Sequence, residues 1–198
     1  MATGVLAQNQ YFVKEHVGFF KAANNYDILD PATGQVILEC REPVLGFWTK
    51  LFRFTNYKIF TPFNIEIRDR TGQLVCRVQR GATFIKSTID VFDGREKRVG
   101  GFKQKLWSIG GAFEVLDERD QVVCLLKGKW TTWEYKFLRG ETELAKVTKK
   151  WAGIGKELFT SADNYMIDIQ PSVPAEGALR LLILGSVMSI DMVFKERR

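Results

Sequence analysis

Few residues in this 198-residue chain could carry covalent chemistry. His16 is the single histidine, and no serine or cysteine lies near it in sequence to form a nucleophile and base pair. A general base needs a partner that positions it, so this histidine suits the surface or a strand end better than a catalytic site. We therefore expect a protein that is not an enzyme and that uses no cofactor.

Paired lysines beside tryptophan indicate a different chemistry, the binding of anions. Lys103 and Lys105 are two residues apart, as are Lys127 and Lys129, so each pair faces one side of a strand. Trp130 follows the second pair. Such a surface can meet anionic lipid head groups, to which each nearby basic residue contributes about 1 kcal/mol. The alternative is that these lysines form the ordinary solvated face of half-buried strands.

The overall charge agrees with an anionic partner without identifying it. The net charge is +6 and the sequence pI is about 9.2. Nucleic acid shares this electrostatic basis, but the chain has no recognised nucleic-acid-binding motif, so we expect no such partner. Protein partners stay unknown.

Cysteines and glycines have structural explanations. Cys40, Cys76 and Cys124 are odd in number and lack metal-site spacing, so we expect small buried side chains. Two pairs of adjacent glycines occur, at 100–101 and at 110–111. Neither is followed by the Gly-Lys-Ser/Thr ending of a phosphate-binding loop, so we expect tight turns there.

Composition favours one domain over residues 1–198, with about ten N-terminal residues loosely attached. Hydrophobic residues make up 45% of the chain, enough for a substantial core. We recognise no signal peptide and no lipidation motif, which predicts a cytoplasmic protein.

A hairpin pattern recurs through the chain: an alternating strand, a turn led by aspartate, then a second apolar strand. It covers 26–38, 63–76 and 112–124, with weaker copies at 88–94 and 135–147. Aspartate at a turn start bonds the backbone two residues on, so turn formation explains these acids better than a metal site does. Alternation on both sides of each turn predicts half-buried antiparallel strands, and ten to twelve of them suggest a closed barrel.

The last apolar segment differs from the strands. Its uncharged part runs from Leu181 to Ile190, which is shorter than the roughly 20 residues of a membrane-spanning helix. Apolar residues surround it on all sides, which favours a helix buried inside the sheet. A membrane-inserting tail and a partner-binding helix stay open as alternatives. The expected buried residues are Leu181, Leu182, Ile183, Leu184, Val187, Met188 and Ile190.

At this point the chain resembles a known family. Segments 162–171 and 181–191, together with the hairpin at 63–75, resemble the phospholipid scramblases and the plant LURP-one-related proteins. The resemblance runs from about Tyr26 to Phe194. It implies the Tubby-like fold: mainly β, a closed antiparallel barrel of about twelve strands around a C-terminal hydrophobic helix.

The resemblance also implies a function. It suggests peripheral binding to anionic phospholipid, with a lipid-translocating role, at the inner face of the plasma membrane. The alternative is a soluble cytosolic module that binds a ligand or a protein and transports nothing. The proline-rich arm and the cysteine cluster of scramblases are missing here.

In that family the segment matching 161–172 has been regarded as a calcium loop. Here it offers Asp163 at a suitable position and Asp168 out of register. A calcium loop needs more oxygen ligands than these two weak candidates supply. We expect a strand here and no bound metal.

Overall fold

The computed structural model describes residues 2–16, 25–42, 62–81, 88–104, 112–129, 134–149 and 164–195. At residues 2, 3, 129 and 189–195 it describes the backbone alone.

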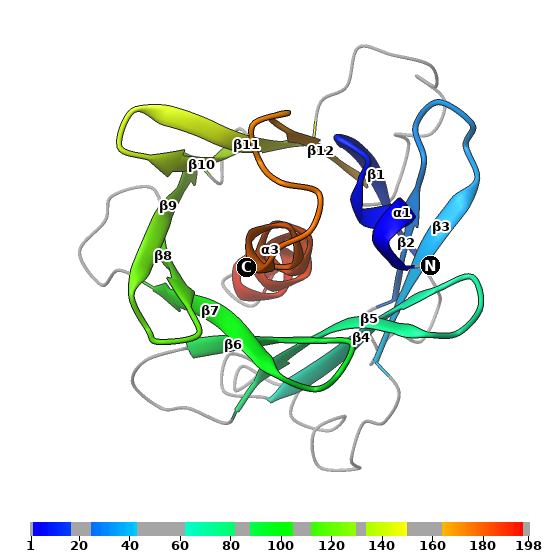
Figure 1. Ribbon diagram of the computed structural model, residues 1–198, viewed down its shortest axis with the longest axis horizontal. Coiled ribbons are helices and arrows are strands. Elements are labelled where there is room, and N and C mark those ends of the chain that lie inside the picture. The colour runs from blue at the N-terminus through cyan, green and yellow to red at the C-terminus, as the bar shows by residue number, and fades with distance from the viewer. Residues whose placement is uncertain are drawn as a thin grey trace.

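Twelve described strands form a closed antiparallel barrel around one helix (Figure 1). Each strand pairs with its neighbours in sequence, and β1 closes the barrel against β12. This confirms the predicted mainly β architecture, with the C-terminal helix packed against the strands. The strands are β1 (Gln10–Glu15), β2 (Tyr26–Leu29), β3 (Val36–Arg41), β4 (Phe63–Asp69), β5 (Leu74–Arg80), β6 (Thr88–Asp93), β7 (Arg98–Gln104), β8 (Ala112–Asp117), β9 (Val122–Lys129), β10 (Glu134–Arg139), β11 (Thr142–Thr148) and β12 (Asn164–Ile169).

The aspartate-led turns form as the sequence predicts. In the β4–β5 hairpin, Asp69 Oδ1 accepts hydrogen bonds from the backbone N–H groups of Thr71 at 2.8 Å and Gln73 at 3.0 Å. A hydrogen bond from the Thr71 hydroxyl, together with these backbone bonds, lowers the pKa of Asp69. Asp93 and Asp117 repeat the same pair of backbone bonds at their own turns. These acids therefore shape hairpins.

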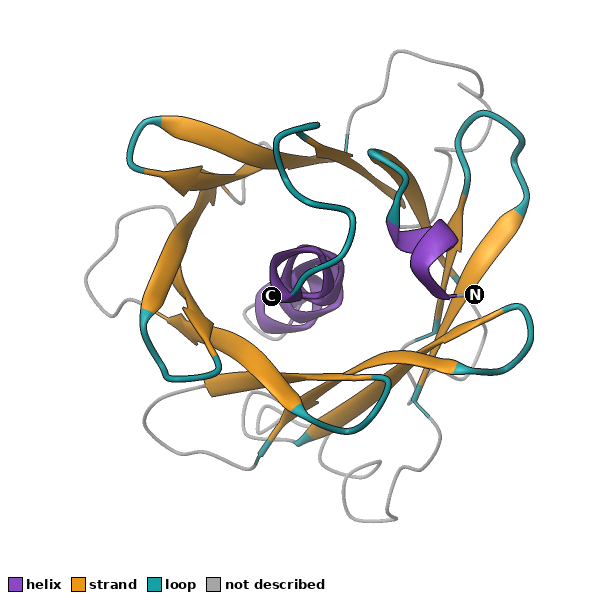
Figure 2. Cartoon of the chain, in the orientation of Figure 1, coloured by secondary structure: helices purple, strands orange, loops and turns teal. Residues whose placement is uncertain are grey.

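The helix α3 (Ala178–Lys195) runs through the middle of the barrel (Figure 2). Leu182, Ile183, Leu184 and Met188 are at most 1% exposed, and the helix packs against β5, β6 and β7. Leu181 and Val187 are buried as well, whereas the side chain of Ile190 is outside the described part. The apolar side chains of residues 181–188 are thus buried inside the barrel.

The N-terminal residues, which we expected to be loosely attached, make specific contacts. A short helix α1 (Ala2–Leu6) lies at the mouth of the barrel. The Tyr11 hydroxyl donates a 2.9 Å hydrogen bond to the carbonyl oxygen of Val5, and Arg180 bonds Gln8 and Asn9.

One glycine prediction was wrong. Gly100 and Gly101 lie inside strand β7, not in a tight turn. A Cβ at Gly101 would come within 2.3 Å of the Ile89 carbonyl oxygen, and Gly100 adopts a φ of +148°. Glycine is needed here because the backbones approach too closely for a side chain. The pair at 110–111 lies outside the described residues.

The two ends of the barrel differ in their connections. At one end, here called the tight-turn end, the connections are 30–35, 70–73, 94–97, 118–121 and 140–141. At the other, here called the far end, β1, β3, β5, β7, β9 and β11 finish and their partner strands begin. Glu15 opposite Tyr26 and Lys129 opposite Glu134 mark this end in the register.

Candidate functional site

Two of the predicted lysines lie exposed near the far end of the barrel. Lys103 is on β7, opposite Thr88 and Glu114, and Lys127 is on β9. Neither side chain makes an ion pair within the described part of the chain. Both ammonium groups are therefore available to an external anion.

The structure does not place the rest of the predicted group. Lys105 and Trp130 lie outside the described residues, and so does the side chain of Lys129. The cross-strand neighbours of Lys127 are Ala112 and Lys136. Lys136, however, is held by Glu143 at 2.9 Å, and this carboxylate raises the pKa of the lysine.

Sequence reasoning missed a third exposed lysine at this end. Lys14 lies one residue before the end of β1, opposite Asp27 and Asn164, and it too has no ion pair among the described residues. The segment 10–15 does not alternate cleanly between buried and exposed positions. The exposed position of Lys14 could therefore not be predicted from an alternation of polar and apolar residues in this segment.

Two cations nearer the tight-turn end, Lys97 and Arg98, are paired with acidic neighbours. The Nζ of Lys97 lies 2.7 Å from Glu118, which raises the pKa of the lysine and lowers that of the glutamate. Arg98 bridges Asp90 at 2.8 Å and Asp120 at 2.6 Å. Arg70 and Arg119 in the tight turns are exposed without an ion pair among the described residues, so unpaired cations occur at both ends.

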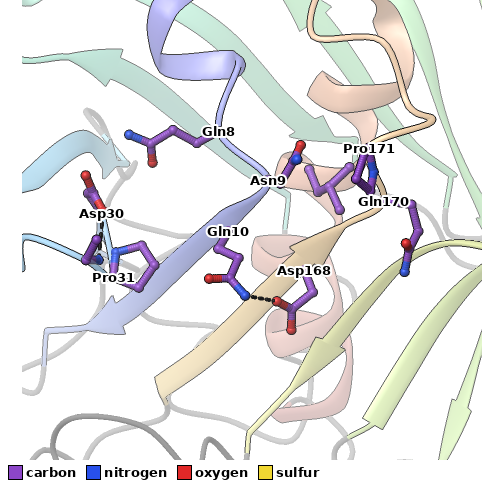
Figure 3. A pocket seen from close by; sticks show the side chains of 10 residues that line it. Gln8, Asn9, Gln10, Asp30, Pro31, Asp168, Gln170 and Pro171 are labelled. Atoms are coloured by element: carbon purple, nitrogen blue, oxygen red, sulfur yellow. Dashed lines mark hydrogen bonds between the residues drawn. The ribbon is translucent and has the colours of Figure 1, made fainter.

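A polar cleft opens beside the N-terminal segment at the tight-turn end (Figure 3). Its volume is about 560 Å³, and residues 8–10, 30–32 and 168–171 line it. Asp168, one of the two metal candidates, accepts a 2.7 Å hydrogen bond from Gln10 Nε2 and belongs to strand β12. The other candidate, Asp163, lies outside the described residues. Within the described chain, no three His, Cys, Asp or Glu residues gather as a metal site would require.

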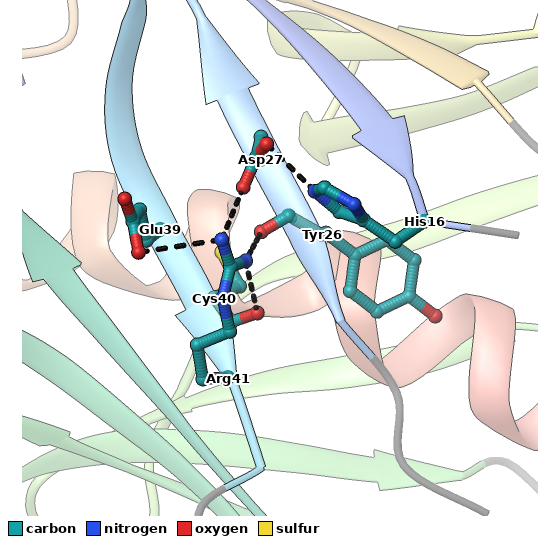
Figure 4. A network of polar contacts seen from close by, with 6 residues as sticks. All are labelled: His16, Tyr26, Asp27, Glu39, Cys40 and Arg41. Atoms are coloured by element: carbon teal, nitrogen blue, oxygen red, sulfur yellow. Dashed lines mark hydrogen bonds and ion pairs between the residues drawn. The ribbon is translucent and has the colours of Figure 1, made fainter. Parts of the chain in front are cut away.

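His16 joins a network of charged residues at the end of β1 (Figure 4). Its Nε2 lies 2.6 Å from Asp27 Oδ2, and Asp27 Oδ1 accepts a 2.7 Å hydrogen bond from Arg41. Arg41 also donates to the Tyr26 carbonyl oxygen at 2.7 Å and lies 3.3 Å from Glu39. The imidazole is oriented by a carboxylate, but no described nucleophile contacts it. These contacts connect the end of β1 to β2 and β3.

No helix in the described part of the chain combines the length and the apolar character that a bilayer crossing requires.

Known proteins resemble this chain over nearly its full length. The scramblase family model matches residues 3–197. The altered inheritance rate of mitochondria protein 25 of Saccharomyces cerevisiae is 22% identical, covering all of this chain and 73% of its own length. A phospholipid scramblase family protein of Schizosaccharomyces pombe is 26% identical over 90% of this chain and 51% of its own.

Two further similarities are more restricted. Mouse phospholipid scramblase 1 is 36% identical, but the match covers 32% of this chain and only 19% of the mouse protein. The X-ray structure of an Arabidopsis thaliana protein of the LURP-one-related group superposes with a TM-score of 0.53. That alignment covers 96% of this chain and 92% of the plant chain at 15% identity, so it establishes the fold alone.

Proposed function

Because this chain belongs to the scramblase family, we propose that it binds anionic phospholipid peripherally, with the far end of the barrel facing the membrane. Binding, and no bond-making catalysis, would be its activity. Its place would be the cytoplasm, at the inner face of the plasma membrane.

The observation that carries the proposal is the uneven distribution of residue types between the two sets of connections. All five tryptophans of the chain occur in segments that join strand ends at the far end: 43–61, 105–111, 130–133 and 150–163. The tight-turn connections contain no aromatic residue. Tryptophan is enriched where proteins meet the head-group layer of a bilayer, because its ring is apolar and its N–H is polar.

Charge follows the same division. The six segments 17–24, 43–61, 82–87, 105–111, 130–133 and 150–163 contain Lys21, Lys50, Arg53, Lys58, Lys86, Lys105, Lys150 and Lys156, against two acids, Glu157 and Asp163. Lys14, Lys103 and Lys127 on the neighbouring strand ends add unpaired charge. Basic residues beside an anionic surface each contribute about 1 kcal/mol, so this end would be the favoured one.

The test is flotation of the full chain with neutral and anionic liposomes. We expect binding to phosphatidylserine vesicles, weakened by salt because exposed charges are screened. K103E/K127E should weaken binding at least about 30-fold, the equivalent of two lost basic contacts. The matched control, R70E/R119E, makes the same change in net charge at the tight-turn end, where Arg70 and Arg119 are exposed. Equal loss in both variants would refute the proposed orientation.

Intrinsic fluorescence gives an independent measurement of that orientation. Since every tryptophan occurs in the far-end segments, vesicles that carry brominated acyl chains should quench the emission on binding. Flotation without quenching would mean that another face docks. Calcium or a chelator in parallel samples tests whether the metal affects binding.

Translocation of lipid between leaflets would be a further activity of the bound protein. A fluorescent-lipid flipping assay on the same vesicles tests it, with K103E/K127E as the variant that should lose it.

The polar cleft favours the alternative, a soluble module that binds a small ligand or a protein. Pockets that bind ligands are concave and offer a few convergent polar groups, as this one does. Failure to float under any condition would select this alternative.

A further inference from the structure

A buried arginine connects three separate segments at the tight-turn end of the barrel. Arg180, in the first turn of α3, is 2% exposed. Its Nε donates to the Pro174 carbonyl oxygen at 2.9 Å, and its Nη2 donates to that of Val173 at 3.0 Å, both in the β12–α3 connection. Its guanidinium also donates to the Gln8 carbonyl oxygen and to Asn9 Oδ1, the latter at 2.9 Å.

This position is costly for a cation. The first turn of a helix is the positive end of its dipole, and the first turn of α3 contains no acidic residue. All these acceptors are neutral oxygens. A buried charge is tolerated only while hydrogen bonds replace its lost hydration. The stability of this end of α3 therefore depends on residues 8 and 9 staying in place.

The N-terminal segment is attached at a second point beside the arginine. The Tyr11 hydroxyl donates a 2.9 Å hydrogen bond to the Val5 carbonyl oxygen of α1. Burial raises the pKa of Tyr11, and nearby Arg180 opposes that rise. Helix α1 has five residues, too few to be stable without such contacts.

We propose that residues 2–9 act as a releasable strap, which holds the first turns of α3 inside the barrel through Arg180. While the strap is in place, α3 is sealed within the sheet. When the strap leaves, Arg180 keeps its acceptors at Val173 and Pro174 but loses those at residues 8 and 9. The helix start then opens without unfolding of the barrel. This inference is independent of lipid binding by the lysines.

Hydrogen exchange of the full chain in lipid-free solution tests the strap. We expect N9A, R180K and a deletion of residues 2–9 each to speed exchange of 181–188 by about tenfold to a hundredfold, the effect of losing hydrogen bonds to a charged group. Strands β4 to β9 should keep their protection. Q10A is the matched control: it removes the bond to Asp168 beside the strap but touches none of the Arg180 contacts.

A double variant separates the strap from general stabilisation. If Asn9 and the rest of the strap act through Arg180, N9A/R180K should exchange no faster than R180K alone, because the shared interaction is already lost. Unchanged exchange of 181–188 in N9A and in the deletion would overturn the proposal. So would equal loss of protection in the helix and all strands, which would make these contacts ordinary determinants of global stability. If R180K does not fold, the exchange rates of N9A and of the deletion variant still test the strap.

Discussion

Cys40 and Cys76 lie on the inner wall of the barrel, on either side of Ile67 in a row that crosses β3, β4 and β5. Both side chains are fully buried, and Cys124 is 3% exposed. Burial disfavours the thiolate, so it raises the pKa of Cys76 to about 12 and that of Cys124 to about 11. The thiols behave as apolar side chains, as their scattered spacing in the sequence predicts.

The raised pKa of Cys76 predicts a loss of stability in alkali. Above the ordinary thiol pKa near 9 the unfolded state releases a proton that the folded state keeps until about pH 12. The free energy of unfolding should therefore fall as pH rises through this window, by about 1.4 kcal/mol per pH unit for this group. Urea unfolding of wild type and C76A between pH 8 and 10.5 checks it. The difference in free energy of unfolding between wild type and C76A should become smaller as pH rises. If the two free energies change in parallel with pH, the prediction is wrong.

At the scale of elements, one glycine sets how closely α3 approaches the sheet. A Cβ at Gly185 would lie 2.9 Å from Val78 Cγ2 and 3.5 Å from Val91 Cγ2. These valines belong to β5 and β6, two of the strands against which the helix packs. A helix interior normally disfavours glycine, so close packing is the reason for it here.

Enlarging this position should destabilise the protein by overpacking. We expect G185L to lower the free energy of unfolding by about 1–3 kcal/mol or more, because Val78 and Val91 cannot both withdraw. Urea titration followed by circular dichroism measures the change. G81L is the control, since Gly81 is exposed and has open space around its Cα. A G185L protein as stable as wild type would show that the helix moves freely within the barrel.

At the scale of the whole molecule, closure of the barrel depends on the first strand. β1 pairs with β12 on one side and β2 on the other, so the sheet has no free edge. Free edges pair with other chains and promote aggregation. The same closed wall is what shields α3 from water.

Removing β1 should therefore open the barrel and destabilise the whole protein. Deleting residues 1–15 exposes the edges of β2 and β12, and we expect aggregation in size-exclusion chromatography and loss of a cooperative thermal transition. Deleting only residues 2–7 keeps β1 and should leave a folded monomer. A folded, monomeric protein without residues 1–15 would mean that the remaining strands close by themselves.

The sequence by itself determined most of the strands, the aspartate turns and the buried character of the last helix. These features depend on local chemistry: alternation with period two, aspartate bonding to nearby N–H groups, and apolar residues on every side of one segment. The lysine candidates also came from spacing, since residues two apart share a face of a strand. The recurring hairpins already indicated ten to twelve strands and a closed barrel, and the family resemblance narrowed the number to about twelve.

Tertiary structure alone decided which charges are free and which segments meet. Arg180 bonds residues about 170 positions away in sequence, and no local pattern encodes such a contact. Lys136 has Glu134 two residues before it at 4.0 Å, but its shorter ion pair, at 2.9 Å, is with Glu143, which only the pairing of β10 with β11 brings beside it. The role of Gly100 and Gly101 was equally hidden, since it depends on how closely β6 and β8 flank β7. Contacts between distant strands follow from register and closure, which only the assembled barrel fixes.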